Sequence, residues 1–258
     1  MQIIIPMTGF GSRFVAAGYK ELKPFIQIQG KPIIQWIVEG MYRDEKNIIF
    51  VVRQDHLDTI PDMEKNLKKI APTAKIFAIK DWVKRGPVYD VLRASSVIDD
   101  GEPSIINYCD FYMTWDYHKF KKDVITRCCD GAVPCYTGFH PHLLIDKNYY
   151  ASCLTDENND LIEIREKYSF EKDKTKAKHS PGVYYFKDGI TLKRYCQALV
   201  DSNETLNGEF YASLPYNYMV KEGKKVWVPT NVEKFCQWGT PEDMADYLFW
   251  TECTRRFS

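Results

Sequence analysis

Short apolar runs alternate with helix-like patterns through the first half of the chain. Four of these runs predict strands buried on both faces of a sheet: residues 3–6, 48–52, 74–79 and 104–108. Between them, helical patterns cover residues 32–41, 56–70 (interrupted by Pro61) and 88–97. This alternation predicts an α/β fold with a mostly parallel, Rossmann-like central sheet, flanked by helices and joined by right-handed crossovers.

The second half of the chain has a less regular pattern. We expect strands at residues 131–137, 182–186 and 225–229, and a hairpin of residues 151–154 and 161–166 around a polar turn. Helices are expected at residues 191–199, 209–221 and 241–251, and the lysine-rich stretch 171–179 is expected to be a mobile loop. Neither a repeat nor a linker-like segment divides the chain, so we expect a single domain over residues 1–258.

Composition narrows the classes of function. The chain has 258 residues, of which 45% are hydrophobic, so it can bury a substantial core. Thirty-five basic and 35 acidic side chains balance, which argues against a nucleic-acid or membrane partner. Eight cysteines show no zinc or redox spacing, and the first residues lack the basic region of a signal peptide. We therefore expect reduced thiols and a cytoplasmic protein.

The most informative stretch follows the first predicted strand. That strand runs into a turn of small residues and one arginine: Thr8, Gly9, Gly11, Ser12 and Arg13. Such a turn lets backbone N–H groups approach a phosphate, because no side chain stands in the way. Lys23 comes about ten residues later, before Pro24, and adds a second fixed positive charge. The pattern lacks the Gly-Lys-Ser/Thr that closes a Walker A loop. It also lacks the third glycine of a dinucleotide-binding fingerprint.

A further Gly30-Lys31-Pro32 turn completes three pieces in order. Together they resemble the signature of the nucleotidyltransferases that activate sugar 1-phosphates, which is a Gly-x-Gly-Thr-Arg turn, then Pro-Lys-Pro, then Gly-Lys-Pro. The chain departs from that signature before the turn, where Pro6-Met7-Thr8 replaces Leu-Ala-Gly, and at Leu22, which replaces the first proline.

Asp110 is the second strong feature. It follows the strand predicted at residues 104–108, and ligands of open parallel sheets bind beyond the carboxyl ends of their strands. The sequence Asn107-Tyr108-Cys109-Asp110 is similar to the family's Asn-Gly-Asp, whose aspartate holds Mg²⁺. The resemblance thus implies a Mg²⁺ cofactor on Asp110, while an ordinary turn aspartate is the simpler alternative.

Weaker similarities continue along the chain. Arg85 and Gly86 fall where the family contacts the nucleobase. Glu166 and Lys167 resemble a Glu-Lys pair that contacts the acceptor substrate, and Gly182 belongs to a strand that walls the acceptor pocket. For each of these positions an ordinary turn or a solvated charge is the structural alternative.

The most serious departure lies in residues 235–243, which resemble the family's Asp-x-Gly-Thr-Pro-Glu-Asp. The second metal-binding aspartate of the family falls on Gln237, which is neutral and a poor Mg²⁺ ligand. Glu209, which we also expect beside the acceptor, is the first acid to test as a replacement ligand, and Asp116 is the second.

The resemblance implies a nucleotidyl transfer, with NTP and a small phosphorylated compound as substrates. The acceptor's phosphate attacks the α-phosphorus, and pyrophosphate leaves. Arg13 is expected on the pyrophosphate and Lys23 on the α-phosphate. Residues 1–115 would form the nucleotide-binding half and residues 116–258 the acceptor-binding half. The absence of a hexapeptide-repeat segment favours CTP, with a sugar, polyol or amino-alcohol phosphate as acceptor and a role in capsule or surface polysaccharide synthesis.

Two alternatives belong to other classes. A glycosyltransferase of similar fold would bind a finished nucleotide sugar, but such enzymes usually carry Asp-x-Asp, which the sequence after Cys109 does not supply. An inactive nucleotide-binding regulator is suggested by Gln237. The sequence is compatible with a homo-oligomer and does not set the oligomeric state.

Overall fold

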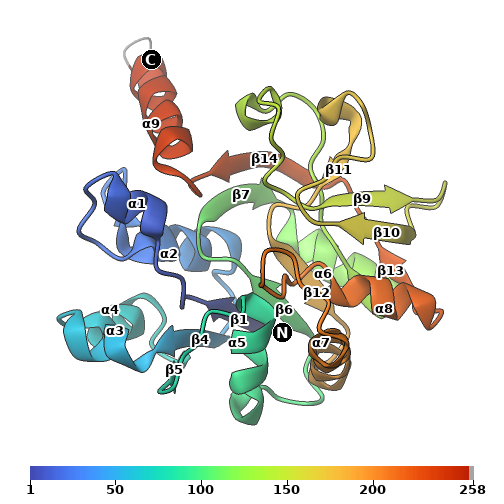
Figure 1. Cartoon of the computed structure of the whole chain (residues 1–258), viewed down its shortest axis with the longest axis horizontal. Helices are drawn as coiled ribbons and strands as arrows, with labels where there is room; N and C mark the ends of the chain where they lie inside the picture. Colours follow the sequence, from blue (N-terminus) through green and yellow to red (C-terminus); the bar gives the residue numbers. More distant parts are fainter. Residues whose placement is uncertain (256–258) are drawn as a thin grey trace.

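The computed structural model describes residues 1–255 of the chain (Figure 1). A seven-stranded sheet lies at its centre, in the order β13-β8-β12-β6-β1-β4-β5. Its strands are β1 (Gln2–Pro6), β4 (Asn47–Arg53), β5 (Lys75–Ile79), β6 (Ser104–Asn107), β8 (Gly131–Ala132), β12 (Val183–Phe186) and β13 (Val226–Trp227). Pairing is parallel from β5 through β4 and β1 to β6, and β12 runs antiparallel between β6 and β8. The expected mostly parallel α/β fold is confirmed.

Three smaller sheets complete the β structure of the described residues: β2 (Gln27–Ile28) with β3 (Lys31–Pro32), β7 (Phe111–Trp115) with β14 (Val232–Gln237), and β9 (Ser152–Thr155) with β10 (Leu161–Arg165) and β11 (Lys178–His179). The α-helices are α1 (Ser12–Ala16), α2 (Ile33–Trp36), α3 (Gln54–Thr59), α4 (Met63–Ile70), α5 (Pro87–Arg93), α6 (Tyr117–Thr126), α7 (Gly189–Ser202), α8 (Pro215–Lys221) and α9 (Pro241–Arg255). Figure 1 shows β7 and β14 side by side, with α9 leading away from the body after β14.

Alternation along β1 places its side chains in two separate cores. Ile3 and Ile5 are fully buried on the face covered by α2, α4 and α6. Ile4 points to the other face, which α5, α7 and α8 cover. A strand buried on both faces has to be apolar at every position, which explains the uninterrupted run at the start of the chain.

Several expected elements differ from the structure in their extent. The helix expected at 32–41 is α2 followed by a π-helical turn, η2 (Ile37–Met41). The helix expected at 88–97 is α5, which ends at Arg93, and a separate 3₁₀ turn, η3 (Ser95–Val97), follows it. The strand expected at 131–137 ends at Ala132, after which backbone bonds go to residues 227, 229 and 179. The break at Pro61 is confirmed, because α3 and α4 are separate helices.

Two expectations were wrong. The helix expected at 209–221 starts only at Pro215, because the backbone of Phe210 bonds to Arg85 and Val88 instead of forming a helical turn. The stretch 171–179, expected to be a mobile loop, holds a 3₁₀ turn, η5 (Lys174–Lys176), capped by Asp173, and then β11, which pairs with β9. Elements that the sequence did not indicate include α1, α6, β2, β3, β7 and β14.

No helix within residues 1–255 has both the length and the apolar content required to cross a bilayer.

Candidate functional site

Two neighbouring cavities open beyond the carboxyl ends of β1 and β6. The turn cavity, of about 230 Å³, is bordered by the glycine-rich turn that follows β1. The tyrosine cavity, of about 250 Å³, is bordered by tyrosines from the second half of the chain. Four residues border both cavities: Lys23, Tyr108, Asp110 and Tyr211. The cavities therefore meet at these side chains, where parallel strands end and ligands usually bind.

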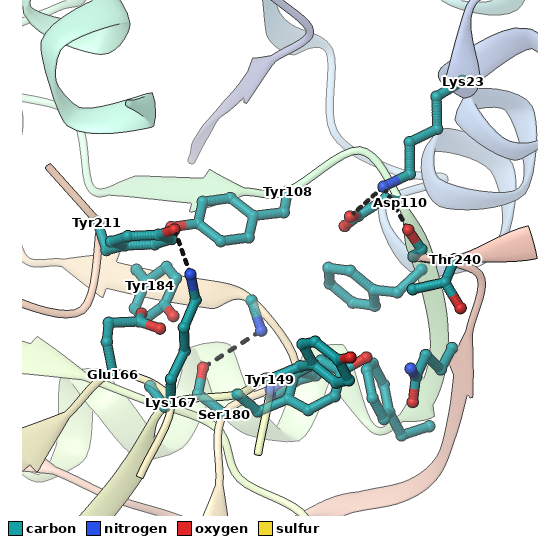
Figure 2. A pocket seen from close by; sticks show the side chains of 18 of the residues that line it. Lys23, Tyr108, Asp110, Tyr149, Glu166, Lys167, Ser180, Tyr184, Tyr211 and Thr240 are labelled. Carbon is teal, nitrogen blue, oxygen red and sulfur yellow. Dashed lines mark hydrogen bonds and ion pairs between the residues drawn. The ribbon is translucent and has the colours of Figure 1, made fainter. Parts of the chain in front are cut away.

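Lys23 and Asp110 form an ion pair at this meeting point (Figure 2). The Lys23 Nζ atom lies 2.7 Å from Asp110 Oδ2 and donates a second hydrogen bond, of 3.0 Å, to the carbonyl of Gly239. Lys23 begins a 3₁₀ turn with proline as its second residue, η1 (Lys23–Phe25), which fixes where its side chain starts. The pair is partly exposed, with 17% of the lysine and 33% of the aspartate side chain accessible. An incoming ligand can therefore reach both charges.

The glycine-rich turn packs directly against this lysine. Gly11 adopts a left-handed conformation with φ of 59°, and a β-carbon there would lie 3.4 Å from the Lys23 β-carbon. Thr8, Gly9 and Gly11 border the turn cavity, as does Gly86 from the start of α5. The structure thus brings these four predicted nucleotide-binding residues to one cavity.

The Thr8 hydroxyl forms a hydrogen bond with a residue that the sequence analysis did not single out. It donates a hydrogen bond to Asp90, whose side chain lies in α5 and is 2% exposed. Burial raises the pKa of the Asp90 carboxyl to about 6. This buried pair joins the glycine-rich turn to α5 beside the turn cavity.

Glycine is required at position 86 because two segments of the chain approach each other closely there. Its φ is +92°, and a β-carbon would lie 2.6 Å from the backbone nitrogen of Phe210. The Phe210 N–H donates to the Arg85 carbonyl at 2.8 Å, and the Val88 N–H donates to the Phe210 carbonyl at 3.1 Å. The loop before α5 is thereby tied to residues 209–212 of the second half.

Two predicted site residues on these segments lie elsewhere than expected. Arg85 borders neither cavity, because its guanidinium packs over the rings of Tyr89 and Phe210, 4.7 and 5.0 Å from their centres. Glu209, expected beside the acceptor, borders the turn cavity and pairs with Lys84 at 3.0 Å.

The tyrosine cavity contains the other predicted acceptor residues. Lys167 and Lys23 reach into it from opposite sides (Figure 2). The Lys167 Nζ atom donates to the Tyr211 hydroxyl at 2.8 Å, and Glu166 accepts a hydrogen bond of 2.6 Å from the Ser213 hydroxyl. Gly182 forms part of the wall. A β-carbon there would come within 3.1 Å of the rings of Tyr108 and Phe111, at a φ of +115°.

Tyr108 and Tyr211 border both cavities, and the sequence did not single them out. The tyrosine content gave no means of telling wall residues from core residues. Their roles depend on contacts between segments far apart in the chain, such as the 3.1 Å bond from the Ala212 N–H to the Tyr108 hydroxyl.

Burial raises the pKa of the Glu166 carboxyl to about 7. A carboxyl with a raised pKa binds more protons in the folded than in the unfolded protein, so its contribution to the free energy of unfolding falls as pH rises from about 4.3 to 7. We expect Glu166→Gln to remove this fall. Urea denaturation from pH 5 to 8 should show the wild type losing stability relative to the variant. Parallel curves for the two proteins would contradict the assignment.

A third space adjoins the other two and is called here the cation cavity. It measures about 240 Å³ and is bordered by Phe10, Gly11, Ser12, Arg13, Phe14, Lys23, Lys84 and Gly239. It contains three cationic side chains, and no acidic side chain among the described residues borders it. Arg13 also borders the tyrosine cavity, where its guanidinium lies 5.3 Å from the centre of the Tyr149 ring. Arg13 and Lys23 of the opening signature thus surround connected space together with Asp110.

The carboxylate of Asp110 fits a Mg²⁺ ion that takes its other ligands from phosphate oxygens and water, because Mg²⁺ usually uses one or two carboxylates. Within residues 1–255, no three His, Cys, Asp or Glu side chains are grouped to hold a metal by themselves. Gln237 turns its amide nitrogen to Asp243 on α9. Asp116, weighed as a replacement ligand, caps α6 by accepting from the Lys119 N–H at 2.8 Å. Of the three acids weighed as ligands, Asp110, Glu209 and Asp116, Asp110 is the one that borders both the turn and the tyrosine cavity.

The comparison with known sequences gives one short similarity. No protein-family model matches the chain. Over 84 residues, 30% of the chain, it is 32% identical to UTP–glucose-1-phosphate uridylyltransferase of Bacillus subtilis (strain 168). The matched part spans 29% of that protein's length.

Solved structures match over nearly the whole chain. A nucleoside-diphosphate-sugar pyrophosphorylase from Vibrio cholerae RC9 has a TM-score of 0.76 and 19% identity, covering 96% of this chain and 100% of that one. A UDP-glucose pyrophosphorylase complexed with UDP-glucose has a TM-score of 0.73 and 16% identity, covering 98% of each chain. The inositol-1-phosphate CTP transferase from T. maritima has a TM-score of 0.71 and 15% identity, covering 94% and 90%. The fold implied by the opening signature is confirmed as that of the sugar nucleotidyltransferases.

Proposed function

We propose that the protein is a nucleotidyltransferase that joins the nucleotidyl group of an NTP to a small phosphorylated acceptor and releases pyrophosphate. The observation that carries this proposal is the Lys23–Asp110 pair, which borders the turn and tyrosine cavities at once. A transfer between two substrates needs a charged group where their reacting phosphates meet.

On the nucleotide side, the turn cavity is assigned to the nucleoside and the cation cavity to the phosphates. Backbone around Thr8, Gly9 and Gly11 approaches the ligand without side-chain hindrance. Ser12 and Arg13 border the cation cavity, where Arg13 faces the pyrophosphate.

On the acceptor side, the tyrosine cavity is assigned to the phosphorylated substrate. Among the described residues, the Lys167 Nζ atom donates its hydrogen bond to the neutral Tyr211 hydroxyl, so its positive charge can turn to a phosphate in this cavity. Glu166 and the backbone at Gly182 border the remainder of the acceptor. In this scheme the nucleotide is held mainly by residues 1–115 and the acceptor mainly by residues 116–258.

The reaction needs no general base, because the attacking phosphate oxygen is already ionised. A bond forms between that oxygen and the α-phosphorus, and the bond from the α-phosphorus to the bridging oxygen breaks, with both electrons leaving on pyrophosphate. Lys23 neutralises charge on the α-phosphate as it develops. Asp110 would hold Mg²⁺, which supplies additional positive charge to the phosphates when bound.

We propose CTP as the nucleotide and a sugar, polyol or amino-alcohol phosphate as the acceptor. The similarity to an inositol-1-phosphate CTP transferase supports CTP together with a phosphorylated polyol. A contribution to capsule or surface polysaccharide synthesis belongs to the same proposal.

The test is to incubate the protein with Mg²⁺, each of the four NTPs in turn and a panel of phosphorylated sugars, polyols and amino alcohols, and to measure pyrophosphate. We expect release with CTP and one class of acceptor. Absence of pyrophosphate in every combination would contradict the proposal. Transfer from a finished nucleotide sugar without pyrophosphate would instead indicate a glycosyltransferase, and nucleotide binding with no turnover would indicate a regulator.

A further inference from the structure

Lys84 lies outside every motif of the sequence and occupies a central place in the site. It borders both the turn cavity and the cation cavity. Lys23 is the other cation that borders both of these cavities. Lys84 thus lies where a ligand extending from the turn cavity into the cation cavity would pass.

The ion pair that Lys84 forms with Glu209 is weak. The Lys84 Nζ atom lies 3.0 Å from Glu209 Oε1, and 63% of the lysine side chain is exposed. Exposed ion pairs of this kind contribute little to stability, so the pair is readily exchanged for a stronger anion. Glu209 itself borders the turn cavity but not the cation cavity.

The backbone that carries Lys84 is fixed. The adjacent Arg85 carbonyl accepts from the Phe210 N–H at 2.8 Å, and Gly86 leaves no room for a β-carbon against Phe210. Because its neighbours in the loop are anchored while its side chain is exposed, rotation of the side chain alone is enough for Lys84 to reach another partner. Together with Arg13 and Lys23 it gives the cation cavity three positive charges.

We propose that Lys84 binds the β- and γ-phosphates of the nucleotide and the pyrophosphate formed from them. Before the nucleotide binds, Glu209 holds Lys84 beside the site, and the phosphates then displace Glu209 from Lys84. This inference rests on the proposed function. It assigns opposite roles to two side chains: Lys84 attracts the phosphates, and Glu209 competes with them for Lys84.

The experiment measures binding of inorganic pyrophosphate and of CMP by titration calorimetry in the full chain. We expect Lys84→Ala to weaken pyrophosphate binding at least about tenfold, since a lost charge-assisted hydrogen bond commonly costs that much. Lys84→Arg should keep most of the affinity, and Glu209→Gln should increase it. CMP affinity should not change in Lys84→Ala, because CMP lacks the outer phosphates.

The matched control is Lys80→Ala, an exposed lysine on the same loop that borders neither the turn cavity nor the cation cavity. It should bind pyrophosphate as the wild type does. The inference is overturned by any of three results: no pyrophosphate binding by the wild type, Lys84→Ala within about twofold of the wild type, or equal weakening for CMP. A lack of turnover with every NTP would instead contradict the proposed function and leave the binding result standing.

Discussion

Replacing Lys23 by alanine is expected to lower turnover about a thousandfold, the upper range for removing one preorganised donor from developing charge. Its ammonium borders the turn, tyrosine and cation cavities together, so no other described side chain occupies the same place. Gly239 and Asp110 hold it from one side, and its position at the start of η1 fixes it from the other. The loss should fall on kcat, because the charge that Lys23 neutralises grows in the transition state.

The measurement is pyrophosphate release under saturating substrates, with thermal unfolding followed in parallel. Lys31→Ala is the matched control, because Lys31 comes from the same signature and pairs with Glu39 at 2.8 Å, but borders none of the three cavities. Lys31→Ala should retain wild-type turnover. Near-normal turnover in Lys23→Ala, with an intact fold, would remove Lys23 from the mechanism.

The sequence was most informative where a local rule decides the structure. Parallel strands buried on both faces have to be apolar, so the runs at β1, β4, β5 and β6 were visible. Polar residues that follow such strands gather at one edge of the sheet, which is why Asp110 could be placed near the turn after β1. Lys23 was added by the resemblance of the opening segment. The 2.7 Å contact between Lys23 and Asp110 joins segments 87 residues apart in the chain.

The sequence was least informative where the structure depends on contacts between distant segments. The strand β7 follows Asp110 directly, yet its residues have no alternation of apolar and polar positions, and its partner β14 comes more than a hundred residues later. The segment around Phe210 has a helix-like pattern, but its backbone bonds to Arg85 and Val88 prevent a helix there. Those same bonds bring Lys84 and Tyr211 to the site, so both were missed.

The departure at Gln237 has a physical consequence for the metal. Its amide nitrogen donates to Asp243, which also accepts from the Thr240 hydroxyl, so the glutamine is held toward α9. Burial raises the pKa of Asp243 above its ordinary value. The charge that a second aspartate would bring to a metal is absent, so a divalent ion held by Asp110 would depend more strongly on the phosphates of the substrates.

For this reason Asp110→Asn is expected to abolish metal binding and to lower turnover by a factor of about 10² to 10³. Asparagine keeps the size of the side chain and removes its charge. Binding of Mn²⁺ in the presence of nucleotide, followed by electron paramagnetic resonance, reports the metal without relying on turnover. The wild type should bind Mn²⁺ under these conditions, and the variant should not.

Asp116→Asn is the matched control, because Asp116 was the other aspartate considered as a ligand and the structure uses it to cap α6. Asparagine caps helices as well as aspartate, so Mn²⁺ binding, turnover and stability should all stay near wild type. If Asp110 only anchors Lys23, Asp110→Asn would lower the melting temperature and turnover but leave Mn²⁺ binding unchanged. That result would place the metal on another residue, while the assignment of Lys23 to the α-phosphate would stand.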